Sequence, residues 1–140
     1  MKNMPKPKSP EKASAKTADE FLSLLSDDRK QALGSMRKLL LKHDKAVEES
    51  VEPMMGMEML IYKDKGVFKY GLASAKQYLS LHSMILYGKP ELREKYSKKL
   101  PNAKFQKGCI NFADLTVFPL SIAEEMFAEF SKCPYPLKWK

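Results

Sequence analysis

The sequence is poor in cysteine and has no long apolar run. Its two cysteines, Cys109 and Cys133, form neither a CxxC pair nor a disulfide framework, which favours a reduced protein. No apolar stretch reaches the roughly 18–20 residues that a membrane-spanning helix requires. The lysines near the N-terminus are not followed by an apolar stretch, so we expect no secretory signal. Together these absences predict a cytoplasmic protein with no membrane partner.

Motifs of several enzyme classes are also missing. The six glycines are scattered and form neither a Walker loop nor a dinucleotide-binding motif. The two histidines, His43 and His82, belong to no HxH or HExxH pattern, so their spacing indicates no transition-metal site. We therefore expect a protein that is not an enzyme. A nucleophile at Cys109, activated by a neighbouring base, is the catalytic alternative.

Acidic residues are in deficit, and the net charge is +8. Residues 1–16 hold five lysines and one glutamate, and residues 89–107 hold seven basic and two acidic residues. Basic patches attract nucleic acid or anionic surfaces, although a tail of Lys, Pro and Ser is also a common solubilising terminus. Any nucleic-acid binding should be weak and salt-sensitive. The candidate phosphate-binding residues are Lys89, Arg93, Lys98 and Lys99.

The chain has enough apolar residues to form a hydrophobic core. Apolar residues make up 44% of its 140 residues, and this length is typical of one domain. We expect residues 1–16, which lack hydrophobic periodicity, to be a disordered basic tail. Residues 17–131 are predicted to form a single domain, followed by an aromatic, proline-punctuated tail at residues 132–140.

Three apolar segments predict the strands of a central sheet. Met57–Lys63 alternates with period 2, as a strand with one buried face does. Asp64-Lys65-Gly66 resembles a hairpin connection, because glycine tolerates the positive φ of such turns. Val67–Ala73 would be the returning strand, and Gln77–Leu86 the next one.

The faces of the strand at Val67–Ala73 follow from its alternation. Phe68 and Tyr70 are expected on one face, and Lys69 and Gly71 on the other. Because Gly71 has no side chain, we expect a neighbouring group to approach the sheet closely there.

Helical segments precede and follow the predicted sheet. Thr17-x-x-Glu20 and Ser121-x-x-Glu124 are capping-box patterns that indicate helix starts. Helices are predicted at residues 17–25, 26–43, 90–100 and 121–131, and shorter strands at residues 47–51 and 107–112. This order predicts an α+β fold, with two layers, a mostly antiparallel sheet of four to six strands, and helices packed mainly on one face.

Three stretches of the chain form a characteristic combination. They are DDRKQALGSMRKLL, SAKQYLSLHSM and KFQKGCINFADLTVFPLSIAEEMFAEF. Together they resemble the YdhG-like proteins, bacterial domains of unknown function, over roughly residues 20–131. The most specific matches are Tyr78–His82 and Lys107–Phe112. The chain departs from the family at Cys109, where relatives carry a small hydroxyl residue, and at Met54–Met57, where they carry Tyr-Gly-Met-Pro.

The resemblance implies a two-layer fold of helices and strands. Because one member is described as a frataxin-like iron chaperone, it also implies iron handling, with iron as the possible cofactor. Iron requires hard oxygen ligands, and the best carboxylate cluster is Asp19, Glu20, Asp27 and Asp28. The same residues also fit helix capping and a solvated surface, and a net charge of +8 is unusual for an acidic metal carrier.

A site for a small anionic or polar ligand is the other possibility. Histidine titrates near neutral pH and lysine can hold an anion, although a histidine on a sheet face also fits a structural, hydrogen-bonded role. The pocket candidates are Met55, Tyr62, Tyr70, His82, Lys107 and Cys109. The sequence therefore predicts a small non-enzymatic domain, monomeric or homodimeric, that binds a small ligand, a metal or a protein partner. The alternative is a basic protein associated with nucleic acid.

Overall fold

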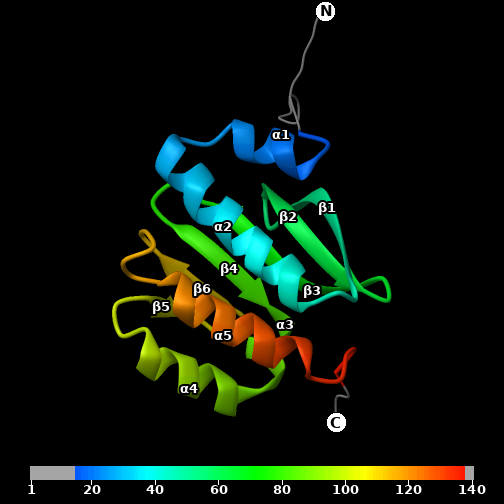
Figure 1. Ribbon diagram of the computed structural model, residues 1–140, viewed down its shortest axis with the longest axis vertical. Coiled ribbons are helices and arrows are strands. Elements are labelled where there is room, and N and C mark those ends of the chain that lie inside the picture. The colour runs from blue at the N-terminus through cyan, green and yellow to red at the C-terminus, as the bar shows by residue number, and fades with distance from the viewer. Residues whose placement is uncertain (1–14, 138–140) are drawn as a thin grey trace, which may run out of the picture.

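The computed structural model describes residues 15–137 as one antiparallel sheet with helices packed around it (Figure 1). The strands are β1 (Val47–Met54), β2 (Met57–Asp64), β3 (Val67–Ser74), β4 (Leu79–Ser83), β5 (Lys104–Phe105) and β6 (Cys109–Phe112). The helices are α1 (Ala18–Ser23), α2 (Asp27–His43), α3 (Met84–Gly88), α4 (Pro90–Lys99) and α5 (Leu120–Ser131). The strand order is β1-β2-β3-β4-β6-β5, which confirms the predicted α+β fold.

Parts of the two predicted tails lie outside the described residues. These are residues 1–14 of the basic tail and residues 138–140, which include Trp139. Ala15 is described; it is buried and donates its backbone N–H to a carboxylate oxygen of Glu58. Between residues 15 and 137, each helix is too short or too polar to cross a lipid bilayer.

The two predicted capping boxes have different outcomes. The one at Thr17 is confirmed, because its side chain accepts the backbone N–H of Glu20 and the Glu20 carboxylate accepts that of Thr17. The one at Ser121 is wrong, because α5 begins one residue before it, at Leu120. The extended backbone of Pro119 starts the helix, and its carbonyl accepts the N–H groups of residues 122 and 123.

Two tight turns connect the first three strands. Met55–Gly56 and Lys65–Gly66 are two-residue hairpin turns, and all four residues have positive φ. This conformation matches the twist of the flanking strands and favours glycine at its second position. The predicted three-residue connection is therefore one residue too long, because Asp64 belongs to β2 and pairs with Val67.

A bulge in β3 overturns the predicted faces of that strand. Tyr62 pairs with Tyr70 and Lys63 with Phe68, so Lys69 is an extra residue. Phe68 packs against the small apolar cluster on the outer face, whereas Tyr70 belongs to the main core under the helices. Lys69 turns to the same side as Tyr70. The expectation that Phe68 shares a face with Tyr70, and Lys69 with Gly71, is wrong because alternation fails at a bulge.

The predicted strand at Gln77–Leu86 is shorter in the structure. β4 ends at Ser83, and the chain then turns into α3. The Ser83 side chain accepts the backbone N–H of Ile85 at 3.1 Å, which caps the short helix. The apolar residues that continued the strand pattern, Ile85 and Leu86, are buried in the main core from the helix instead.

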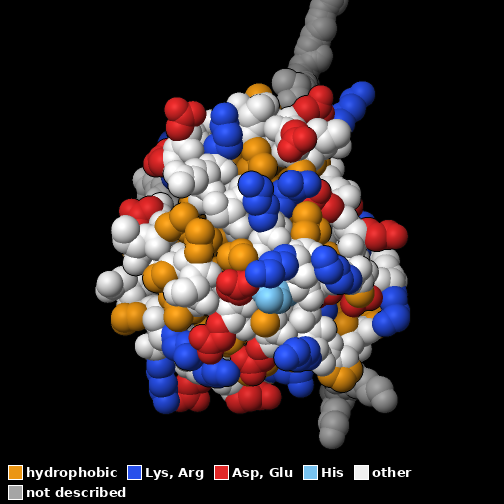
Figure 2. All heavy atoms as spheres, viewed as in Figure 1, with side chains coloured by type: hydrophobic (Ala, Val, Ile, Leu, Met, Phe, Trp, Pro, Cys, Tyr) orange, Lys and Arg blue, Asp and Glu red, His pale blue; other side chains and the backbone are white. Residues whose placement is uncertain are grey.

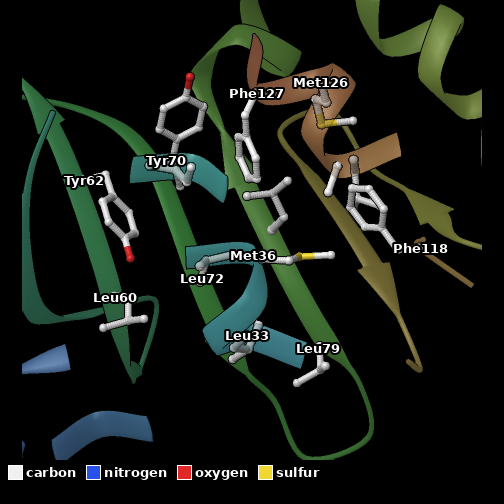
Figure 3. Packing of buried hydrophobic residues seen from close by; sticks show 14 of the residues in the cluster. Leu33, Met36, Leu60, Tyr62, Tyr70, Leu72, Leu79, Phe118, Met126 and Phe127 are labelled. Carbon is white, nitrogen blue, oxygen red and sulfur yellow. The ribbon is translucent and has the colours of Figure 1, made fainter. Parts of the chain in front are cut away.

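The main core lies between the sheet and the two longest helices (Figure 3). Leu33 and Met36 of α2 and Phe127 of α5 meet side chains of the strands, and the rings of Tyr70 and Phe127 pack edge to face at 5.6 Å. On the other face of the sheet, a Cβ at Gly71 would stand 2.6 Å from Cε of Met59. The expected close approach at Gly71 is therefore confirmed.

Candidate functional site

The structure separates most of the predicted pocket residues. Tyr62 and Tyr70 are fully buried in the core, where they donate to Glu49 at 2.6 Å and to Asp44 at 2.8 Å. Burial raises the pKa of both phenols. Met55 lies exposed in the first hairpin turn. Lys107 is exposed between β5 and β6, where its backbone carbonyl accepts from Arg93 at 2.9 Å.

His82 and Cys109 are the two candidates that come together. They are direct partners in the ladder between β4 and β6, so their side chains share a face of the sheet. Ser80 and Asn111 form the neighbouring pair on the same face. This is the face opposite the helices, because the alternating residues Leu79 and Leu81 belong to the main core.

We call His82, Cys109, Ser80 and Asn111 the outer-face network, and its hydrogen bonds determine which atoms carry the protons. Ser80 donates its hydroxyl proton to Oδ1 of Asn111 at 2.8 Å, and Nε2 of His82 lies 3.2 Å from the same hydroxyl oxygen. Because a serine has one proton to donate, Nε2 of His82 must carry the proton of that second bond. Burial lowers the pKa of His82, so the ring is neutral at pH 7. Within residues 15–137, its Nδ1 then has no hydrogen-bond partner.

Cys109 carries a protonated thiol. The residue is 7% exposed, and its Sγ–H donates to Oε1 of Gln106 at 3.1 Å. Burial raises the thiol pKa, and the neighbouring Ser80 hydroxyl group opposes the rise more weakly. A thiol with a raised pKa is a poor nucleophile, because the thiolate is the reactive form.

A hollow of about 380 Å³ adjoins this network at the β5 edge of the sheet. We call it the amide cleft. The residues that matter for its chemistry are Gln77, Tyr78, Asn102, Lys104, Gln106 and Asn111. The chain has only six Asn and Gln residues, and four of them line this one cleft.

The four carboxamides of the amide cleft differ in how they are held. Oxygen atoms of Gln106 and Asn111 accept from Cys109 and Ser80, which leaves their amino groups as the remaining donors. Gln77 and Asn102 are exposed, and within residues 15–137 their side chains form no hydrogen bond. The cleft thus offers two amino donors held by hydrogen bonds and, among the described residues, two carboxamides with unengaged donors and acceptors.

The predicted metal ligands do not converge. Glu20 serves the helix cap and accepts the N–H groups of Lys16 and Thr17. Asp28 accepts from Ser26 at 2.7 Å, which lowers the pKa of its carboxyl. Asp19 and Asp27 line a hollow between α1 and α2, together with lysines. In the described part of the chain, no group of three or more His, Cys, Asp or Glu could hold a metal ion.

The predicted phosphate-binding cations are mostly engaged. Lys98 lies 3.6 Å from Glu94, and Lys99 lies 3.1 Å from Glu125. Arg93 donates to the backbone carbonyls of residues 86 and 107. Lys89 is half-buried. Figure 2 shows basic and acidic side chains interspersed on the helix-covered face, which is not a continuous basic surface.

Sequence reasoning missed both the amide cleft and a buried ionic cluster. The cleft had a signal, because its four carboxamides all lie between residues 77 and 111. The cluster had none: Lys69 is 1% exposed, and its Nζ lies 2.7 Å from Asp44 and 3.8 Å from Asp64. Only the bulge turns this lysine inward.

Comparisons with known proteins give no assignment, so the geometry of the amide cleft and its network carries the functional proposal. No family model matches the sequence, no curated protein is significantly similar to it, and no solved structure matches the fold.

Proposed function

We propose that the protein is a small cytoplasmic binding domain, without catalytic activity, whose small polar ligand occupies the amide cleft. The observation that carries this proposal is the gathering of four of the chain's six carboxamide side chains around one hollow. A carboxamide presents donors and an acceptor without net charge, so it recognises a ligand by its hydrogen-bonding pattern.

The protonation states next to the cleft support binding over catalysis. A cysteine nucleophile needs a thiolate beside a base. The Cys109 thiol instead donates to Gln106, and burial raises its pKa. The Nε2 proton of His82 points to Ser80. Both groups hold the carboxamides in place, Cys109 directly and His82 through Ser80.

Iron handling and nucleic-acid binding have less support. Iron handling rests on the resemblance to YdhG-like proteins. The carboxylates that would bind iron do not form one cluster: two accept hydrogen bonds at the starts of helices, and two line a hollow that also contains lysines. Nucleic-acid binding would need free cations on α4, where Lys98 and Lys99 are paired with glutamates.

The proposal is tested by NMR of the carboxamide groups. Side-chain NH₂ resonances of ¹⁵N-labelled protein would be followed while glucose, adenosine, glycylglycine and inorganic phosphate are added in turn. We expect at least one probe to shift the signals of Gln77, Asn102, Gln106 and Asn111 saturably. Gln31, which lies outside the cleft, is the internal control.

A matched pair of variants checks the site. The double variant Gln77→Ala/Asn102→Ala should lose binding, whereas Gln31→Ala should keep it. If no probe moves the four cleft signals, or if Gln31 moves with them, the amide cleft is not the binding site.

A further inference from the structure

We infer that the ligand of the amide cleft is an adenine nucleotide, that is, an adenine base carrying a phosphate. This inference rests on the proposed function and specifies its ligand class. It draws on three features of the cleft lining: the unengaged carboxamides, the exposed ring of Tyr78, and the ammonium group of Lys104.

The carboxamides suit the edges of adenine. Adenine presents an amino donor beside a ring-nitrogen acceptor, and a carboxamide offers the complementary acceptor and donor in one plane. Gln77 and Asn102 have both groups available within the described residues. Gln106 and Asn111 add amino donors whose orientation is fixed by Cys109 and Ser80.

The same lining is poorly suited to guanine. The major-groove edge of guanine carries two acceptors, which are read best by the donors of arginine or lysine, and the one lysine of the lining, Lys104, is the group that would hold the phosphate. The N1–H and amino group of guanine need a strong acceptor such as a carboxylate. Among the described residues, the lining of the amide cleft contains no Arg, Asp or Glu. The cleft should therefore distinguish adenine from guanine.

Tyr78 and Lys104 supply the other two contacts. Tyr78 is 40% exposed, immediately before β4, and an exposed aromatic ring at a cleft is a surface on which a base can stack. Lys104 is exposed on the edge strand β5 and forms no ion pair within residues 15–137. As the one cation in the described lining, it is the group that would hold the phosphate.

Calorimetry of the full chain tests the assignment. The ligands are adenosine 5′-monophosphate (AMP), adenosine, guanosine 5′-monophosphate, ribose 5-phosphate and glucose. We expect AMP to bind at least about tenfold more tightly than each of the others, because it alone satisfies base, ring and phosphate contacts.

Two variants with matched controls locate the contacts. Lys104→Ala should remove the advantage of AMP over adenosine, whereas Lys76→Ala, an exposed lysine outside the cleft lining, should not. Tyr78→Leu should weaken AMP and adenosine alike. Each variant should unfold at the same temperature as the wild type, so that lost binding is not lost folding.

The outcomes separate this inference from the proposed function. Equal binding of AMP and ribose 5-phosphate, or of AMP and the guanine nucleotide, would overturn the adenine assignment. Glucose or glycylglycine shifting the cleft signals while AMP does not would overturn it too, but would keep the binding function. If no compound binds, both fail.

An adenine base carrying a phosphate could come from a free nucleotide or from a nucleic-acid strand, and a single-stranded oligoadenylate distinguishes the two. Tighter binding of the oligomer than of AMP would support the inference with a nucleic-acid strand as the source. Equal or weaker binding would support it with a free nucleotide.

Discussion

Among single residues, Lys69 is the most unusual. Its ammonium group is buried between the carboxylates of Asp44 and Asp64, and Asp44 also accepts the hydroxyl proton of Tyr70 at 2.8 Å. The ring of Tyr135 lies 5.2 Å from the same ammonium group. Burying charges is unfavourable unless they are paired and hydrogen-bonded. Lys69 therefore holds the end of α2 and two strands in one arrangement.

Replacing Lys69 should be strongly destabilising. Lys69→Met leaves the carboxylates of Asp44 and Asp64 buried without their cation, and we expect the free energy of unfolding to fall by about 3–5 kcal/mol. Urea unfolding measures it. Lys76→Met, at an exposed position, should change it by less than about 0.5 kcal/mol. The double variant Lys69→Met/Asp44→Asn should recover part of the stability that Lys69→Met loses. Equal losses of stability in Lys69→Met and in the control Lys76→Met would contradict the prediction.

His82 should make stability depend on pH near neutrality. Burial lowers its folded-state pKa below that of the unfolded chain, so the unfolded state binds more protons between the two values. Stability then rises with pH through this interval and falls as the solution is acidified.

The variant His82→Gln isolates this effect, because glutamine can keep a donor to Ser80 but does not titrate. Between about pH 7.5 and pH 5.5, the wild type should lose more stability than His82→Gln in urea unfolding. His43 and the carboxylates are present in both proteins and cancel. Equal losses would show that His82 is not protected from protonation in the folded state.

At the scale of the elements, Thr17 and Ser121 allow a matched comparison, because the sequence predicted both as helix caps and only Thr17 is one in the structure. Thr17→Ala should lower stability by about 0.5–2 kcal/mol, because the hydroxyl caps α1. Ser121→Ala should have little effect, since Ser121 lies inside the first turn of α5 and Pro119 is the cap. Urea unfolding of the two variants side by side checks the ranking. A larger loss for Ser121→Ala would reverse it.

The elements also show what sequence patterns can predict. The alternating pattern of β2 correctly predicted which residues share a face. Met59 and Ile61 belong to the small apolar cluster on the outer face, and Leu60 and Tyr62 belong to the main core. The end of β4 was missed because a buried helix turn has the same apolar composition as a strand end. The faces of β3 were missed because a bulge leaves no mark in composition.

The candidate site was predictable only in part. The sequence drew attention to His82 and Cys109 separately, and pairing them requires the strand order β4-β6, which is a long-range property. The amide cleft joins the segment before β4 to both sides of β5, and its members meet only because β4, β6 and β5 pair in that order. Carboxamides also lack a characteristic spacing, unlike metal ligands or phosphate loops.

At the scale of the whole molecule, the segment after α5 returns to the β2–β3 hairpin. The hydroxyl group of Tyr135 donates to the backbone carbonyl of Phe68, and Lys65 donates to the carbonyl of Tyr135 at 3.0 Å. Tyr135 is buried within the main core. This return closes the end of the core at which Lys69 lies.

Removing the Tyr135 ring should therefore weaken the whole fold. We expect Tyr135→Ala to lower the free energy of unfolding by about 2–5 kcal/mol. Tyr135→Phe, which removes only the hydroxyl group, should lower it by about 0.5–1.5 kcal/mol. Tyr78→Ala, which truncates an exposed ring, is the control in urea unfolding. A loss for Tyr135→Ala no larger than the control would show that this segment does not hold the core in solution.

The bulge makes β3 one residue longer than its pairing with β2 requires. Without Lys69, the pairs Tyr62–Tyr70 and Lys63–Phe68 would follow one another in unbroken register, and the Lys65–Gly66 turn would be unchanged. A related chain that loses the buried ammonium group by deleting this residue would differ in length and not only in residue type. In an alignment it would show a one-residue gap at position 69, accompanied by uncharged residues at positions 44 and 64.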